Sequence, residues 1–204
     1  MTALAVDAPE VDEALCTALA KGADRAVKVS GWEKALSARS SAALFAQVLS
    51  ATPGLLPAEL ILLGCQAIDD LDGHVAPLLS RRLELPYVGV VSRVEVDASA
   101  GRATVTKEFA GGVRGEFEVT LPAVLGIQAA EKPPRYVPVA KVRAAMKSGK
   151  LESVPALSSA AGAPLVEVLQ LAKPEVTEHA EMLEGSPEVV AVKLVEILAT
   201  RGLP

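Results

Sequence analysis

The sequence predicts an α/β fold in which helices cover a mostly parallel β-sheet, followed by an antiparallel meander and a C-terminal arm with one helix. Through residues 1–91, short apolar runs alternate with segments of helical periodicity, which is the pattern of successive βαβ units. The run ELILL at 59–63 is apolar throughout, as expected of a strand whose two faces are both covered. After residue 91 the pattern changes to alternating extended runs, which predict the meander.

The first half divides into strands and helices with short turns between them. Strands are expected at 2–6 (TALAV), 25–29 (RAVKV), 59–63 and 87–91 (YVGVV). The first helix has apolar residues at helical spacing and stops at Gly22, a favourable C-cap residue. The second runs through SARSSAALFAQVLSATPG and stops at Pro53 and Gly54, and the third is VAPLLSRRLEL.

The following segment contains no helix candidate. Three extended runs, RVEVD, RATVTKEF and GEFEVTL, are separated by ASAG and by the glycine-rich AGGVR. Alternation at Val94 and Val96, and again at Phe117 and Val119, predicts an antiparallel meander with one buried face. The apolar run LPAVLGI is expected to return to the centre of the sheet.

The last third of the chain is less regular. EKPPRYVPV is an extended connector and AKVRAAMKSGK a short basic helix, whereas small residues and proline dominate from Val154 to Ser186. A final helix starts at Pro187 and ends before Gly202, and its wide apolar stripe needs a covering surface. Residues 1–150 are therefore expected to form a nucleotide-binding-like α/β domain, and 151–204 an arm and helix that pack on a partner subunit.

Composition narrows the class of protein. Half of the residues are hydrophobic, which supplies a sizeable core, and the net charge of −5 disfavours nucleic acid as a partner. No apolar run approaches the roughly eighteen residues of a membrane span, and no secretory signal is found at the N-terminus. Cys16 and Cys65 lack CxxC spacing, so two reduced thiols in a cytoplasmic protein are expected.

Neither a catalytic nucleophile nor a metal centre is predicted. The two histidines, His74 and His179, lie outside motifs such as GxSxG and HExxH, and no GxGxxG or GxxxxGK[ST] occurs. The spacing of acids in IDDLDGH resembles part of a calcium loop, but the flanking helices and terminal glutamate of an EF-hand are missing. A hairpin turn explains AGGVRG better than phosphate binding does.

The stretch LLGCQAIDDLDGH, residues 62–74, is the candidate ligand site. It leaves the carboxyl end of a predicted strand, where parallel sheets bind ligands, and leads into a helix N-terminus, whose unpaired N–H groups suit a phosphate. Asp69, Asp70 and Asp72 would repel a phosphate that they faced, so they are expected to cap the helix or fix the loop. The residues alone leave a second interpretation open, in which Asp72 N-caps the helix and nothing binds.

Four stretches, in the same order, resemble the beta subunit of electron transfer flavoproteins, a family that includes the FixA proteins of nitrogen fixation. LLGCQAIDDLDGHVAPLLSRRLELP is similar to the family's nucleotide-binding segment, and TALAKGADRAVKV to its ALAMGADRAVHV segment. VTKEFAGGVRGEFEVTLPAVLGI resembles its signature of a basic residue and an acid, two glycines and a strand ending in LPAV. KPPRYVPVAKVRAAMKSGKLE resembles its N-x-P-R-Y…MKAKKK segment, so the likeness covers residues 2–152.

The resemblance implies an adenine-nucleotide hydrolase-like, Rossmann-like fold and a heterodimer with an alpha subunit. FAD would lie mainly in the alpha subunit near the interface, and the beta subunit would hold AMP or, in electron-bifurcating members, a second FAD. Such a subunit is not a catalyst on its own: it supports the flavin and contacts an acyl-CoA or other flavin dehydrogenase, here through Leu165 as an exposed anchor. The nucleotide-binding residues implied are Val6, Gly64, Cys65, Gln66, Ala67, Ile68, Asp69, Asp70, Leu71, Asp72, Gly73, His74 and Val75.

The chain also departs from the family pattern. The family's opening strand and helix have no counterpart in this sequence, so either Met1 is a misplaced start or the chain is a shortened paralogue with a weakened AMP site. Val6 and Asp7 stand where a small residue and glycine are common, His74 replaces glutamine, and Gly126 replaces serine or threonine. The alternative interpretation is a non-redox scaffold or adenine-nucleotide-binding protein that has lost the flavin role.

Overall fold

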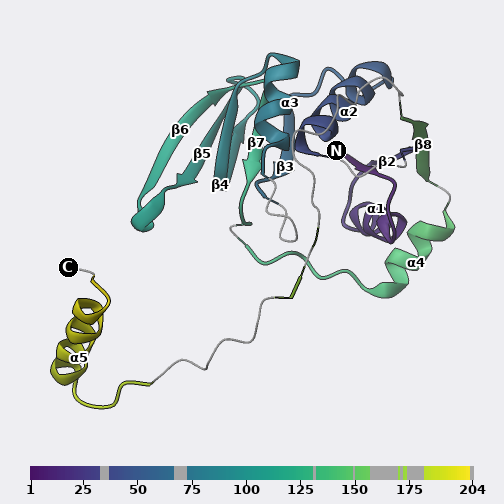
Figure 1. Cartoon of the computed structure of the whole chain (residues 1–204). Helices are drawn as coiled ribbons and strands as arrows, with labels where there is room; N and C mark the ends of the chain where they lie inside the picture. Colours follow the sequence, from purple (N-terminus) through teal and green to yellow (C-terminus); the bar gives the residue numbers. More distant parts are fainter. Residues whose placement is uncertain are drawn as a thin grey trace. The chain divides into compact units, whose positions relative to one another are not determined.

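The chain forms two compact units, Met1–Glu167 and Val168–Pro204. The first unit contains both β-sheets and helices α1 to α4, and the second contains helix α5 (Figure 1). No helix in the described part of the chain is long and apolar enough to cross a membrane. The computed structural model describes residues 1–32, 37–66, 73–130, 132–148, 150–156, 170, 172–173 and 182–202.

Three parallel strands form the first sheet, in the order β1 (Thr2–Val6), β2 (Arg25–Ser30) and β8 (Leu151–Pro155). Helix α1 (Val11–Ala20) packs on this sheet and contacts α4 (Val139–Lys147). All of these elements are expected from the sequence except β8, because LESVP lacks the apolar alternation of a strand. Since β8 pairs with β2, the first unit extends past the boundary expected near residue 150.

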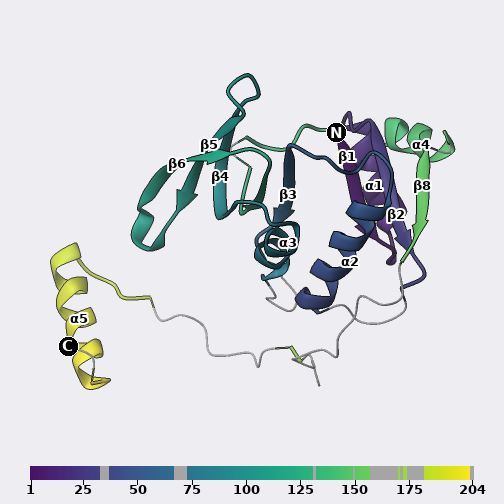
Figure 2. The same cartoon turned by 90° about the horizontal axis from the view of Figure 1, so that it is seen from above.

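Five strands form the second sheet, in the order β3 (Leu60–Gly64), β7 (Ala123–Ile127), β4 (Tyr87–Asp97), β5 (Arg102–Glu108) and β6 (Arg114–Thr120). β3, β7 and β4 are parallel, whereas β4, β5 and β6 form the expected antiparallel meander. β7 lies between β3 and β4, which confirms that LPAVLGI returns to the interior of the sheet. The parallel strands are therefore divided between two sheets (Figure 2).

A shared apolar core joins the two sheets. Helix α2 (Ala38–Ala51) begins after Ser37, whose hydroxyl accepts a hydrogen bond from the Ser40 N–H at 3.2 Å, and α3 (Val75–Leu83) lies between β3 and β4 in the chain. Side chains of both β1 and β3 pack against one cluster. The buried members of this cluster come from β2, α2, the turn after α2, and α3: Val27, Val29, Ala42, Leu44, Val48, Leu49, Leu55 and Leu79.

The meander buries only the central part of its apolar face. Val119 is buried, as the alternation predicts, and it packs with Val105 and with side chains of β7. The predicted burial of Phe117 and Val96 is wrong, since these side chains are 41% and 52% exposed. Phe117 lies on the outer strand of the sheet and Val96 near the end of β4, where no described layer covers them. The turn between β5 and β6 contains a single 3-10 turn, η1 (Ala110–Gly112), which confirms a hairpin at AGGVR.

The second unit contains α5 (Pro187–Thr200), with proline in its first turn and Gly202 past its end, as the sequence predicts. Its packing on a partner subunit stays a prediction. Most of its apolar side chains are exposed in the chain by itself: Val189, Val192, Leu194, Val195, Ile197 and Leu198.

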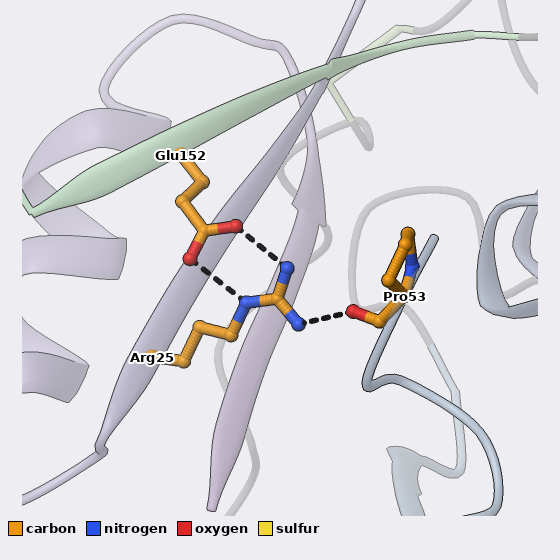
Figure 3. Close-up of polar contacts among 3 residues, drawn as sticks. All are labelled: Arg25, Pro53 and Glu152. Atoms are coloured by element: carbon orange, nitrogen blue, oxygen red, sulfur yellow. Dashed lines mark hydrogen bonds and ion pairs between the residues drawn. The ribbon is translucent and has the colours of Figure 1, made fainter. Parts of the chain in front are cut away.

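A forked ion pair fixes β8 to β2. Arg25 donates to the Glu152 carboxylate through Nε at 2.8 Å and Nη2 at 2.6 Å, and its Nη1 donates to the Pro53 carbonyl at 2.9 Å (Figure 3). One side chain thereby connects the first residue of β2, the strand β8 and the turn after α2. The planar guanidinium suits this bidentate arrangement, which a lysine could not reproduce.

We expect Glu152→Gln to remove a pH-dependent part of the stability. The hydrogen bonds from Arg25 lower the pKa of the Glu152 carboxyl below its usual value. The charged pair therefore stabilises the fold above the pKa of an unfolded glutamate, and this contribution is lost as the pH falls through the lower pKa of the folded protein. Urea unfolding at pH 7 and pH 3 should give a smaller difference for Glu152→Gln than for the unaltered chain.

The matched control is Glu118→Gln. Glu118 on β6 pairs with Arg102 on β5, with 2.7 Å between Glu118 Oε1 and Arg102 Nη1, and both side chains are more than half exposed. Solvent and salt screen such a pair, so its loss should change the unfolding curves little. Equal pH-dependent changes in the free energy of unfolding for the two variants would show that the Arg25–Glu152 pair contributes no more stability than the exposed Arg102–Glu118 pair.

Candidate functional site

The carboxyl ends of β3 and β7 meet at one edge of the second sheet, beside the point where the parallel pairing of β4 with β7 ends. Gly64 at the end of β3 pairs with Ile127 at the end of β7, and the Cys65 N–H donates to the Ile127 carbonyl at 3.2 Å. β4 lies on the other side of β7, and its register shifts between Val88 and Val91. Ligands of parallel sheets bind beyond this edge, so the loop that starts here lies where a ligand site is expected.

The Cys65 side chain bridges these strands. Its thiol donates to the Gly126 carbonyl at 3.0 Å and accepts a hydrogen bond from the Val90 N–H at 3.2 Å. Val90 has a φ of 60°, a left-handed conformation that is unusual for a β-branched residue, so the bulge in β4 is strained. The thiol provides an acceptor for the backbone donor at the strained position.

The Tyr87 side chain reaches along β4 and lies against two glycines. A Cβ added at Gly89 would lie 2.2 Å from the Tyr87 hydroxyl oxygen, and one added at Gly126 would lie 2.9 Å from it. Burial raises the pKa of the Tyr87 phenol, and the nearby Cys65 adds to this effect. The sequence did not predict this arrangement. The signal for it was Gly126, since a serine or threonine at this position would place a side chain against the Tyr87 phenol.

The two described ends of the segment that follows β3 lie close together. Residues 67–72 lie outside the described ranges, but Gln66 and Gly73 on either side of them are described. A Cβ added at Gly73 would lie 2.8 Å from the Cys65 carbonyl oxygen and 3.5 Å from the Gln66 Cβ. The first distance is shorter than carbon and oxygen tolerate, so the two ends of the loop approach this closely only because residue 73 is glycine.

Helix α3 directs backbone donors to the site. The helix begins at Val75, and its N-cap residue, His74, makes no side-chain capping hydrogen bond. The Leu78 N–H bonds the His74 carbonyl at 3.1 Å, and Pro77 has no N–H. The N–H groups of Val75 and Ala76 therefore have no acceptor within the helix and can bind an anion such as a phosphate.

The end of β1 carries the remaining candidate residue. Val6 packs against the same apolar cluster as Val75 of α3, so these two predicted residues share one core. The carboxylate of Asp7, which stands where the family pattern has glycine, lies 3.7 Å from Lys28 Nζ, and Asp12 lies 2.8 Å from the same nitrogen. The hydrogen bond to Asp12 raises the pKa of Lys28, so this cation persists and offsets the charge of Asp7.

The structure thus describes part of the predicted site. The described members are Val6, Gly64, Cys65, Gln66, Gly73, His74 and Val75. The others lie outside the described residues: Ala67, Ile68, Asp69, Asp70, Leu71, Asp72 and Leu165. His74 occupies the N-cap position of α3. Asp72 lies outside the described residues, so its role as a cap stays a prediction. Among the described residues, no group of three or more His, Cys, Asp or Glu side chains could hold a metal ion.

We expect Gly73→Ala to destabilise the chain by about 1–3 kcal/mol, the usual cost of forcing an extra carbon into a filled space. The added Cβ would meet a backbone oxygen at 2.8 Å, so the loop must shift. Gly64→Ala is the matched control, since a Cβ there meets nothing within 4 Å. Urea unfolding of both variants tests the close approach of Gly73 to Cys65, and an unchanged free energy of unfolding for Gly73→Ala would contradict it.

Comparison with known proteins agrees with the family resemblance seen in the sequence. Residues 1–159 match the family described as "Electron transfer flavoprotein domain". The electron transfer flavoprotein subunit beta of Syntrophomonas wolfei is 34% identical over 184 residues, which cover 90% of this chain and 68% of that protein. The subunit beta of Methylophilus methylotrophus is 28% identical over 96% of this chain and 75% of its own length, and that of Bacillus subtilis 29% over 99% and 78%.

The match to the family spans every strand of both sheets and the whole loop from Gly64 to Val75. The chain therefore belongs to the electron transfer flavoprotein family, and within it to the beta subunits.

Proposed function

We propose that this chain supports FAD in a heterodimer with an electron transfer flavoprotein alpha subunit and passes electrons from a dehydrogenase to an acceptor. Membership of the family supports an electron-transfer role, and on this proposal the chain by itself catalyses no bond-making step. The observation that carries the proposal at the level of residues is the carboxyl edge of β3 and β7, where Gly73, just before α3, lies close to Cys65.

An adenine nucleotide fits this edge through its phosphate. The N–H groups of Val75 and Ala76, together with the positive end of the α3 dipole, favour a negative group. Such a site depends on backbone atoms, so it tolerates His74 in place of the family's glutamine. The segment from Gly64 to Val75 therefore forms the phosphate side of an AMP or FAD site in this proposal.

Two surfaces are assigned to protein partners. The exposed apolar side chains of α5 are proposed to pack on the alpha subunit, because a large apolar surface is costly when it faces water. The segment around Leu165 is proposed to contact an acyl-CoA or other flavin dehydrogenase, with this leucine as the anchor.

The two thiols support a cytoplasmic location in this proposal. Cys16 and Cys65 are both free. Burial raises the pKa of Cys16, and Asp12 adds to the effect, so this thiol is protonated and unreactive at neutral pH. Cys65 is engaged by two backbone groups, which suits a reducing compartment better than disulfide formation.

Co-expression with an electron transfer flavoprotein alpha subunit tests the heterodimer. We expect a complex that co-purifies with yellow FAD, with absorbance maxima near those of protein-bound flavin, and that loses its flavin when α5 is removed by truncation after Gly185. The alpha subunit expressed alone is the control for flavin that it holds unaided. A stable chain that neither binds the alpha subunit nor co-purifies with flavin would instead support the alternative, a non-redox scaffold or adenine-nucleotide-binding paralogue.

Equilibrium dialysis of the chain with AMP and adenosine tests the nucleotide site. We expect weak binding of AMP, weaker binding of adenosine, and loss of the difference in high salt, because the described residues offer donors mainly to the phosphate. Gly73→Ala should reduce AMP binding more than it affects adenosine. Equal affinity for AMP and adenosine would contradict a phosphate subsite at α3.

A further inference from the structure

The Tyr87 side chain lies on the face of the second sheet that α3 covers. Tyr87 of β4 is in register with Val124 of β7, and Val124 is in register with Ile61 of β3. Residues in register across neighbouring parallel strands point to the same face of a sheet. Ile61 packs against the cluster that contains Leu79 of α3, and α3 contacts all three strands (Figure 1). The phenol therefore lies between this sheet and α3.

The phenol extends toward the carboxyl edge of the sheet. Tyr87 pairs with Val124, but its hydroxyl oxygen lies against Gly126, two residues farther along β7 and about 6.6 Å nearer to that edge. Only Ile127 follows Gly126 in β7. Because α3 leads from the carboxyl end of β3 back to the start of β4, its first turn lies at the same edge. The hydroxyl is thus directed toward the end of α3 at which the nucleotide phosphate is proposed to bind.

The Tyr87 hydroxyl has no hydrogen-bond partner among the described residues. The nearest polar side chain is engaged elsewhere, since the Cys65 thiol donates to the Gly126 carbonyl and accepts from the Val90 N–H. Tyr87 is partly buried, and this burial raises the pKa of the phenol, so the group stays protonated at neutral pH. A protonated phenol is a hydrogen-bond donor, and a partly buried donor without an acceptor favours an oxygen atom of a ligand.

Gly126 provides the space for this hydroxyl. The family pattern has serine or threonine at this position, and a Cβ added there would lie 2.9 Å from the Tyr87 oxygen. A hydroxyl-bearing side chain at residue 126 and the phenol would therefore compete for one space. Gly89 is equally necessary, since a Cβ there would lie 2.2 Å from the same oxygen. The chain thus has a hydroxyl at this point of the sheet, but supplies it from β4 instead of β7.

We propose that Tyr87 is a ligand-binding residue whose hydroxyl donates a hydrogen bond to a phosphate oxygen of the adenine nucleotide, in place of a serine or threonine hydroxyl at position 126. The inference rests on the proposed function, which puts the phosphate beside the first turn of α3. A phosphate oxygen is a charged acceptor, and hydrogen bonds to charged acceptors are stronger than those between neutral groups. Adenosine lacks this acceptor, so the hydroxyl favours the nucleotide over the nucleoside.

Tyr87→Phe removes the hydroxyl and keeps the ring. Equilibrium dialysis should give an affinity for AMP about tenfold lower than that of the unaltered chain, with the affinity for adenosine unchanged. The matched control is Tyr136→Phe, which changes the other tyrosine, 83% exposed, and should alter neither affinity. Unchanged AMP binding in Tyr87→Phe would overturn the proposal, and so would equal losses for AMP and adenosine, which would place the hydroxyl at the ribose or the base.

Returning the hydroxyl to β7 is a sharper test. Gly126→Ser alone should lower the stability, because its Cβ meets the phenol oxygen. In Tyr87→Phe/Gly126→Ser that oxygen is absent, and the nearest atoms to the Cβ are Gly89 Cα at 3.3 Å and Cys65 Sγ at 3.4 Å, so serine fits. This double variant should recover most of the AMP affinity that Tyr87→Phe loses.

Tyr87→Phe/Gly126→Ala is the matched control for the returned hydroxyl. It adds the same Cβ without an oxygen, so it should bind AMP no better than Tyr87→Phe. Recovery with alanine equal to that with serine would show that filled space, and not a hydroxyl, is what the ligand requires. That result would overturn the proposal.

NMR of the chain labelled with ¹³C at the tyrosine Cζ reports on the phenol directly. The sequence has two tyrosines, so Tyr136→Phe identifies the signal of Tyr87. Inorganic phosphate should shift the Tyr87 signal and leave that of Tyr136 in place, whereas chloride at the same ionic strength should shift neither.

The amide signals of Val75 and Ala76 separate this inference from the proposed function. Phosphate that shifts these amides but not the Tyr87 signal would bind at α3 without the hydroxyl, which would overturn the inference and leave the nucleotide site intact. Phosphate and AMP that shift none of these signals would contradict the proposed site itself, and the role of Tyr87 with it.

Discussion

The apolar cluster beneath α2 is the constraint on which the rest of the first unit depends. No backbone ladder connects the described strands of the two sheets, so only side-chain packing holds β1, β2 and β8 against β3 and β7. Leu44 and Leu79 are fully buried at the centre of this cluster. Truncating a leucine in such a position typically costs about 2–5 kcal/mol, a large share of the stability of a domain. A loss there would separate the carboxyl edges that carry the candidate site.

Local sequence patterns predict the elements well because each carries its own signal. The helical spacing in α2, the uninterrupted apolar run of β3 and the stop at Pro53 are local features, and the structure confirms them. β8 could not be predicted in this way, because its pairing depends on the free edge of β2 and on an ion pair between residues 127 positions apart. The division into two sheets is likewise a property of the whole chain rather than of any segment.

The candidate site shows the same contrast. The position of Gly64 and Cys65 at the end of a strand follows from sequence, and so does the helix start near Val75. The contact of Tyr87 with Gly126 could not be predicted from the sequence, because the two residues lie on different strands and meet only in the folded sheet. The sequence shows Gly126 only as a departure from the family pattern, whereas the structure gives a steric reason for the glycine.

A site built mainly from backbone groups, as proposed for this chain, tolerates departures from the family pattern at the side chains around it. The donors of α3 are backbone N–H groups, so they depend on where the helix begins and not on the side chain at His74. The strands that end at Val6 and Gly64 belong to different sheets but pack on one core.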